Sequence, residues 1–181
     1  ENIVVGEGID GLLGYLCRLF VNPEVSVVTS LGAYPTFNYH VHGFGGQLHF
    51  VPYRSDHEDI ERLVIEAKKR RASLIYLANP DNPMGTFHSN TVIEDIVANL
   101  PENVLLCLDE AYSEFVPKTD LPKISPDNPN VIRMRTFSKG YGMAGARIGY
   151  AIGAVNLVKS FDKIRNHFGI NLLAQRAALV A

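Results

Sequence analysis

The stretch of the chain with the clearest chemical potential joins two predicted strands and contains Ser138, Lys139 and, eight residues after the lysine, Arg147. A glycine-rich turn separates the lysine from the arginine. Apolar strands on both sides would partly remove the Lys139 amine from water, which favours its neutral, nucleophilic form. Such an amine can attack a carbonyl and form a Schiff base. A plain positively charged turn is the alternative, because one short motif is weak evidence.

A carboxylate at the end of an apolar run is the second chemical feature. Asp109 follows the sequence Val-Leu-Leu-Cys-Leu at 104–108. An ionised carboxylate in such a place is costly unless a cation faces it. A ligand cation would meet that need, and a helix N-cap or a salt bridge to a lysine are the alternatives.

Two further loops have the composition of ligand-binding segments. Residues 79–85 read Asn-Pro-Asp-Asn-Pro-Met-Gly, and the two prolines restrict the loop and fix the direction of the Asn82 side chain. Residues 6–11 read Gly-Glu-Gly-Ile-Asp-Gly and open a predicted helix, so their backbone N–H groups form a seat for an anion. A rigid turn and a structural glycine turn are the respective alternatives, and the glycine spacing is neither a dinucleotide fingerprint nor a Walker loop.

The elements that must position these residues alternate between strands and helices. Mostly continuous apolar runs predict strands at residues 3–5, 25–29, 48–51, 74–77, 104–109, 131–135 and 148–152. Helical patterns occur at 9–20, 34–44, 57–70, 89–99, 156–167 and 171–181, and Asp56 is placed to cap the third of them. Residues 118–130 are predicted to form a surface loop.

This alternation predicts an α/β fold with a mostly parallel, doubly wound sheet. The connection from Lys139 to Arg147 is too short for a helical crossover, so the strand at 148–152 is expected to run antiparallel to its predecessor. Ligands of open sheets bind beyond the carboxyl ends of the strands, which is where all the motifs above fall.

Composition places the chain among ordinary globular domains. It has 181 residues, 46% of them hydrophobic and 20% charged, with a formal net charge of −2. One domain with a single good core is expected. No basic patch indicates nucleic acid, no apolar run is long enough to indicate a membrane span, and no signal peptide is evident. The two cysteines are unclustered and the six histidines scattered, so we expect no metal site and a reducing, cytoplasmic location.

Taken together, the segments at 79–85, 108–112 and 133–150 resemble the large domain of fold-type I pyridoxal-phosphate (PLP) aminotransferases of class I/II. The resemblance covers essentially the whole chain and is strongest to the histidinol-phosphate aminotransferase-like branch. It implies a three-layer α/β/α domain with a seven-stranded sheet that contains one antiparallel strand. At position 84, methionine replaces the commoner threonine of that family.

The resemblance also implies roles for individual residues. Lys139 would hold PLP as a Schiff base and later move a proton between the substrate and the cofactor. Asp109 would pair with the pyridine nitrogen, and Asn82 and Tyr112 would hydrogen-bond the phenolic oxygen. Tyr34 would stack on the ring, although an aromatic residue there could equally be core. The phosphate would be held by the backbone and side chains of the remaining predicted site residues, Gly8, Ile9, Asp10, Thr136, Ser138 and Arg147.

The function that follows is transfer of an amino group from an amino acid to a 2-oxo acid, in a homodimer. A decarboxylase similar to threonine-phosphate decarboxylase, or an aminotransferase-like sensor domain of a transcription regulator, are the alternatives. Residues 1–181 are expected to be the PLP-binding domain, truncated at both ends, without an N-terminal arm and a C-terminal small domain. Segment 165–171 departs from the family pattern at His167 and Gly169, so the amino acid substrate is left open.

Overall fold

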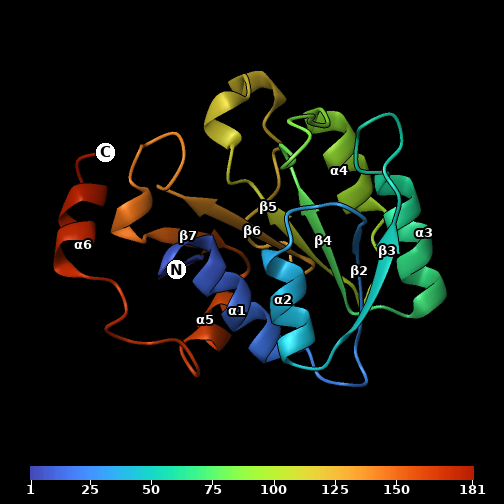
Figure 1. The fold of residues 1–181 in the computed structure, drawn as a ribbon, viewed down its shortest axis with the longest axis horizontal. Helices are drawn as coiled ribbons and strands as arrows, with labels where there is room; N and C mark the ends of the chain where they lie inside the picture. The colour runs from blue at the N-terminus through green and yellow to red at the C-terminus, as the bar shows by residue number, and fades with distance from the viewer.

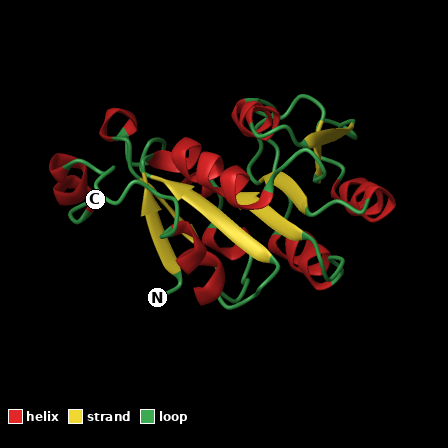
Figure 2. Cartoon of the chain, turned by 90° about the horizontal axis from the view of Figure 1, so that it is seen from below, coloured by secondary structure: helices red, strands yellow, loops and turns green.

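A computed structural model describes residues 1–181 and forms three layers, with helices on both faces of a seven-stranded sheet (Figures 1 and 2). The strand order is β1-β7-β6-β5-β4-β2-β3. Strand β7 runs antiparallel to both β1 and β6, and the other neighbouring pairs are parallel. The predicted α/β fold with one antiparallel strand is therefore confirmed. The strands are β1 (Ile3–Gly6), β2 (Ser26–Ser30), β3 (Gln47–Val51), β4 (Leu74–Ala78), β5 (Leu105–Asp109), β6 (Val131–Thr136) and β7 (Gly149–Ile152).

Six α-helices and three short 3-10 helices complete the chain. The α-helices are α1 (Gly8–Phe20), α2 (Thr36–Gly43), α3 (Ile60–Arg70), α4 (Asn90–Ala98), α5 (Val155–Phe161) and α6 (Leu172–Ala178). The 3-10 helices are Ser113–Phe115, Lys118–Asp120 and Ala144–Ala146, the second of which lies within the predicted loop at 118–130. None of the helices has the length and apolar character needed to cross a membrane.

The sheet separates two hydrophobic cores because alternate side chains of each strand point to opposite faces. On one face α1, α2 and α5 cover β-strand residues such as Tyr76 and Met134. On the other face α3 and α4 cover residues such as Ile75 and Leu108. In β4 and β5 every residue is buried, which explains why these strands read as continuous apolar runs.

Three predicted helix boundaries are wrong by three or more residues: the start of α3, the end of α5 and the end of α6, which stops at Ala178 and not at residue 181. Helix α3 begins three residues later than predicted and is capped by Asp59, whose side chain accepts from the Arg62 N–H, not by Asp56. Ser55 and Asp56 have positive φ values and form a turn that delays the helix. Helix α5 ends at Phe161 and not at residue 167. The N–H groups of residues 162–164 bond to carbonyl oxygens three residues back, and the Asn166 N–H then donates to the Tyr15 hydroxyl at 3.0 Å, so the α-helical pattern is not continued.

Candidate active site

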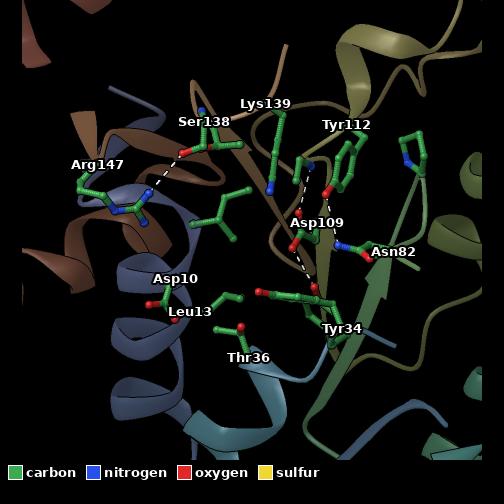
Figure 3. A pocket seen from close by; sticks show the side chains of 16 residues that line it. Asp10, Leu13, Tyr34, Thr36, Asn82, Asp109, Tyr112, Ser138, Lys139 and Arg147 are labelled. Carbon is green, nitrogen blue, oxygen red and sulfur yellow. Dashed lines mark hydrogen bonds between the residues drawn. The ribbon is translucent and has the colours of Figure 1, made fainter. Parts of the chain in front are cut away.

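A cavity of about 290 Å³ lies at the carboxyl ends of β4, β5 and β6, next to the N-terminal end of α1 (Figure 3). This edge of the sheet is where open α/β folds bind ligands. Ten of the eleven predicted site residues line it, although they are spread from Ile9 to Arg147 in the sequence. The eleventh, Gly8, touches the cavity wall through Arg147. The predicted residues are thus brought together in one place.

One end of the cavity is cationic and rich in N–H donors. The Arg147 guanidinium donates to the Ser138 hydroxyl at 3.4 Å, to the Ala144 carbonyl oxygen at 2.9 Å and to the Glu7 carbonyl oxygen at 3.4 Å. These contacts join the turn before α1 to the turn after β6. Gly8 has a φ of +82°, and a Cβ at this position would come within 2.7 Å of the guanidinium. A glycine is therefore required by both backbone and space.

The first turn of α1 borders the same end of the cavity. Ile9 is buried, and Asp10 is exposed with its side chain at the cavity (Figure 3). The Asp10 carboxylate lies 2.8 Å from Nε2 of His40, which comes from α2. The free N–H groups of a helix start favour anions, and Arg147, beside this helix start, adds positive charge. This end has the chemistry of a phosphate seat.

Asp109 lies on the floor of the cavity and is almost fully buried. Its carboxylate accepts hydrogen bonds from the Tyr76 hydroxyl at 2.7 Å and from the Ala111 N–H at 2.9 Å. Burial raises its pKa to about 6, against the lowering effect of these two hydrogen bonds. It neither caps a helix nor forms a salt bridge with a lysine, so both structural alternatives are wrong.

Lys139, Asn82 and Tyr112 form the wall opposite the first turn of α1. The Asn82 side-chain amide donates to the Tyr112 hydroxyl at 3.2 Å, so two polar groups point at one region of the cavity. The Lys139 amine lies 5.3 Å from the centre of the Tyr112 ring. Lys139 is exposed, so the expectation that its neighbouring strands bury the amine is wrong. Those strands end before the turn and leave the side chain pointing into an open cavity (Figure 3).

Tyr34 and Thr136 lie at the rim and the base of the cavity, respectively. Tyr34 is 52% exposed and is therefore not a core residue. Phe37, which shares its segment, is the core residue and stacks on Tyr76 with a centroid separation of 4.5 Å. Thr136 is buried and its hydroxyl accepts from the Ser138 N–H at 3.0 Å. Thr136 thus shapes the turn that carries Ser138.

The sequence interpretation missed two polar residues that line this site, Tyr76 and Thr36. Tyr76 lines the cavity and donates to Asp109, but it sits in β4 among apolar residues and reads as part of a buried strand. Tyr76 is the only residue of that strand with a polar side-chain group. Because a buried tyrosine hydroxyl needs a hydrogen-bond partner, this hydroxyl could have indicated a polar site beside the strand. Leu13, Ala78, Pro80 and Ala111 also line the cavity.

Comparison with known proteins agrees with the geometry of the site. The family model described as aminotransferase class I and II matches residues 1–181. Histidinol-phosphate aminotransferases from Moorella thermoacetica and Bacillus velezensis are 33% and 34% identical over 100% of this chain and 48% and 51% of their own lengths. The chain belongs to the class I and II aminotransferase family, and it spans about half the length of these relatives.

A solved structure supports the same placement. Histidinol-phosphate aminotransferase from Sinorhizobium meliloti, in complex with pyridoxal-5'-phosphate, is 54% identical and superposes with a TM-score of 0.96. The match covers 98% of this chain and 49% of that chain. A decarboxylase from Porphyromonas gingivalis that acts on L-threonine-O-3-phosphate superposes with a TM-score of 0.82 at 22% identity, which is a likeness of fold alone.

Proposed function

We propose that this chain is the cofactor-binding part of a PLP-dependent aminotransferase that moves an amino group from an amino acid to a 2-oxo acid. The observation that carries the proposal is the convergence, in one cavity, of an exposed lysine amine, a buried carboxylate without a basic partner and a cationic phosphate seat. Membership of the aminotransferase family and a relative with bound pyridoxal-5'-phosphate support it.

The residues of the cavity fit this cofactor at each of its functional groups. The missing side chain at Gly8 leaves room for the Arg147 guanidinium beside the start of α1, where the phosphate of the cofactor would be held. The Asp109 carboxylate offers the buried negative charge that a protonated ring nitrogen requires. The Asn82 and Tyr112 pair offers donors for an anionic ring oxygen. When bound, pyridoxal phosphate supplies an aldehyde that accepts the amino group and a ring that takes up electron density from the substrate.

At the phosphate end, Arg147 and Ser138 would donate hydrogen bonds to the phosphate oxygens, assisted by the N–H groups of Ile9 and Asp10. Arg147 is the main source of affinity there, because charge-assisted bonds are roughly twice as strong as neutral ones. Thr136 holds the Ser138 turn in place through the hydrogen bond described above. The anchored phosphate end keeps the cofactor bound while its other end reacts.

At the ring end, the Asp109 carboxylate would hold the proton on the ring nitrogen. Tyr76 and the Ala111 N–H orient that carboxylate. Asn82 and Tyr112 would hold the phenolic oxygen, and Tyr34 would cover one face of the ring and exclude water from it. Each of these contacts strengthens the ring as an electron acceptor.

Lys139 would have two roles in this scheme. Its Nζ atom, which lies 5.3 Å from the centre of the Tyr112 ring, would hold the cofactor covalently in the resting protein. Once an amino acid has taken that place, the released Nζ would accept a proton from the substrate α-carbon and return it to a neighbouring atom. The open surroundings of Lys139 allow this movement.

We further propose that the protein acts as a cytoplasmic homodimer and that residues 1–181 form its cofactor-binding domain. The two buried free cysteines are in keeping with a reducing compartment. Histidinol phosphate is the first amino donor to test, given the 54% identity to the Sinorhizobium meliloti enzyme. A decarboxylase would instead release CO2 without a 2-oxo acid acceptor, so the same assay separates the two activities.

Borohydride reduction in the presence of PLP tests the proposal. The natural polypeptide that contains residues 1–181 is mixed with PLP, reduced and mapped by peptide mass spectrometry. We expect a single phosphopyridoxyl group on Lys139, and none in a Lys139→Ala variant, while the surface residue Lys118 provides an internal control for random labelling. Labelling scattered over surface lysines, equal in both proteins, would contradict the proposal.

A further inference from the structure

The two strands β2 and β4 separate before they reach the cavity. Their parallel pairing joins Val27 to Leu74 and Val28 to Ile75 and extends no further, although β2 continues to Ser30 and β4 to Ala78. In β4 the N–H of Asn79 donates to β5, at Asp109 O, so the N–H of Ala78 points the opposite way, toward β2. A buried N–H in this gap needs an acceptor that β2 does not provide.

The side chain of Glu58 occupies this gap. Glu58 precedes α3 and is 2% exposed. Its Oε1 accepts from the Ala78 N–H at 2.9 Å, and its Oε2 forms a hydrogen bond with the Ser30 hydroxyl. Its own carbonyl oxygen lies 2.9 Å from Nε2 of His88, which anchors the backbone to the segment before α4. One carboxyl group therefore connects the last residues of two strands that no longer pair with each other.

Both strand ends lead directly into the candidate site. The turn after Ser30 carries Tyr34, and the loop after Ala78 carries Asn82. These two side chains border the ring end of the cavity and come from opposite sides of the gap (Figure 3). Glu58 itself does not line the cavity. The distance between the two loops is set where Glu58 binds both strands.

We propose, on the basis of the proposed function, that Glu58 is a positioning residue for the ring end of the cofactor site. Its carboxyl group holds the turn that carries Tyr34 and the loop that carries Asn82 at the separation that the ring requires. The phosphate end does not depend on it, because Ser138, Arg147 and the start of α1 belong to other elements. Removal of the carboxyl group therefore loosens one end of the site and spares the other.

The protonation state of Glu58 agrees with this role. Burial raises the pKa of Glu58 to about 8, beyond the lowering by its two hydrogen bonds, and two nearby carboxylates raise it further. At pH 7 the group is therefore mostly neutral, with its proton on Oε2 in the hydrogen bond to the Ser30 hydroxyl oxygen. A glutamine would keep the acceptor oxygen for the Ala78 N–H and offer an N–H donor to Ser30. The titratable and charged groups whose electrostatics involve Glu58 are Tyr53, Tyr76, Asp81, His88 and Asp109. Arg54, His57 and Asp59 line a second pocket together with Glu58.

Two probes of different size test the proposal on the natural polypeptide. PLP occupies both ends of the site, whereas inorganic phosphate occupies the phosphate end alone. We expect Glu58→Ala to weaken PLP binding about tenfold, the value of one to two lost hydrogen bonds, and to change phosphate binding less than about twofold. Glu58→Gln is expected to bind both probes within about twofold of the unaltered protein. Affinities come from absorbance titration for PLP and from thermal shift for phosphate.

Other outcomes overturn the proposal. Equal losses for PLP and phosphate in Glu58→Ala would assign Glu58 a general structural role, and so would a Glu58→Gln variant as weak as Glu58→Ala. If Glu58→Ala does not fold, Ser30→Ala removes one of the two contacts and is expected to weaken PLP binding about threefold with phosphate unchanged; unchanged PLP binding would refute the proposal. Failure of the unaltered protein to capture PLP at Lys139 would reject the proposed function itself. That failure is distinct from a failure of the Glu58 proposal, which is judged only by differences in affinity between the unaltered protein and its variants.

Discussion

Asp109 and Glu110 are adjacent carboxylates at the end of β5, both buried, and the fold treats them differently. Glu110 is 1% exposed and accepts from Arg133 at 2.7 and 3.1 Å and from Arg135 at 2.9 Å. Asp109 points to the opposite side of the strand, where a tyrosine hydroxyl and one backbone N–H are its hydrogen-bond donors. No arginine or lysine forms a salt bridge with it.

We propose that this difference separates a structural carboxylate, Glu110, from one that serves a ligand, Asp109. The charge of Glu110 is balanced by two guanidinium groups that come from the next strand, so folding alone accounts for its burial. The charge of Asp109 has no such balance, and burial raises its pKa to about 6. A carboxylate kept in this state at the floor of a cavity is suited to a cationic group of a ligand.

The largest expected effect on stability comes from Glu110. Glu110→Gln leaves two partly buried guanidinium groups without a counter-ion, and we expect the free energy of unfolding to fall by about 3 to 4 kcal/mol. Asp109→Asn, the matched change one residue earlier, removes no salt bridge and is expected not to destabilise the cofactor-free protein at pH 7. Urea unfolding followed by circular dichroism measures both. Equal destabilisation by the two variants would contradict the distinction between a salt-bridged Glu110 and an unpaired Asp109.

The pH dependence of stability gives the next largest effect. In the cofactor-free protein the pKa of Asp109 is about 6 when folded against an ordinary value of 3.8, so the folded state binds this proton more tightly. The contribution of Asp109 to stability is therefore fully present below the unfolded pKa near 4 and is lost as pH rises through about 6, on the order of 3 kcal/mol in total.

Unfolding curves recorded from pH 4 to pH 7 test this expectation. Asp109→Asn should remove the part of the fall that ends near pH 6. Glu58→Gln should remove a separate part that begins near pH 4.5, the ordinary pKa of a glutamate, and continues to about pH 8, because the pKa of Glu58 is raised to about 8. A curve that is the same with and without Asp109 would show that this carboxylate carries no burial penalty.

The smallest expected effect is on PLP binding, when the tyrosine that hydrogen-bonds Asp109 loses its hydroxyl. Tyr76→Phe removes the hydroxyl that donates to the carboxylate and keeps the ring that stacks on Phe37. Loss of one hydrogen bond to a charged group is expected to weaken PLP binding about five- to tenfold. Absorbance titration measures it, with Tyr15→Phe as a control because the Tyr15 hydroxyl contacts Glu7 and not Asp109. An unchanged affinity in Tyr76→Phe would mean that the hydroxyl does not orient the carboxylate.

Much of this arrangement could be predicted from the sequence because it depends on local signals. The apolar runs predict every strand within one or two residues, and a short connection predicts the antiparallel strand β7. Lys139, Asn82 and Asp109 follow predicted strands, so the topology alone places them at one edge of the sheet. Each of these inferences needs only the period of the pattern and the position of the residue after it.

The remainder depends on contacts between distant segments. Glu58 lies in a polar stretch before a helix, and nothing near it in the sequence indicates burial against Ser30 and Ala78. Tyr76 is hidden within an apolar strand for a related reason, since its partner is 33 residues away. The hydrogen bond that Asn166 makes after the end of α5 likewise depends on a distant residue, Tyr15, which is 151 residues away. Such pairings arise from tertiary packing, which local periodicity does not record.

The most direct test of the central claim combines one substitution with one change in the ligand. Binding of PLP is compared with binding of an analogue that has carbon in place of the ring nitrogen, in the unaltered protein and in Asp109→Asn. We expect the unaltered protein to prefer PLP about 100-fold, and the variant to lose this preference while binding the analogue as before. Equal weakening of both ligands in Asp109→Asn would contradict the claim that Asp109 is held for the cationic nitrogen of a ligand.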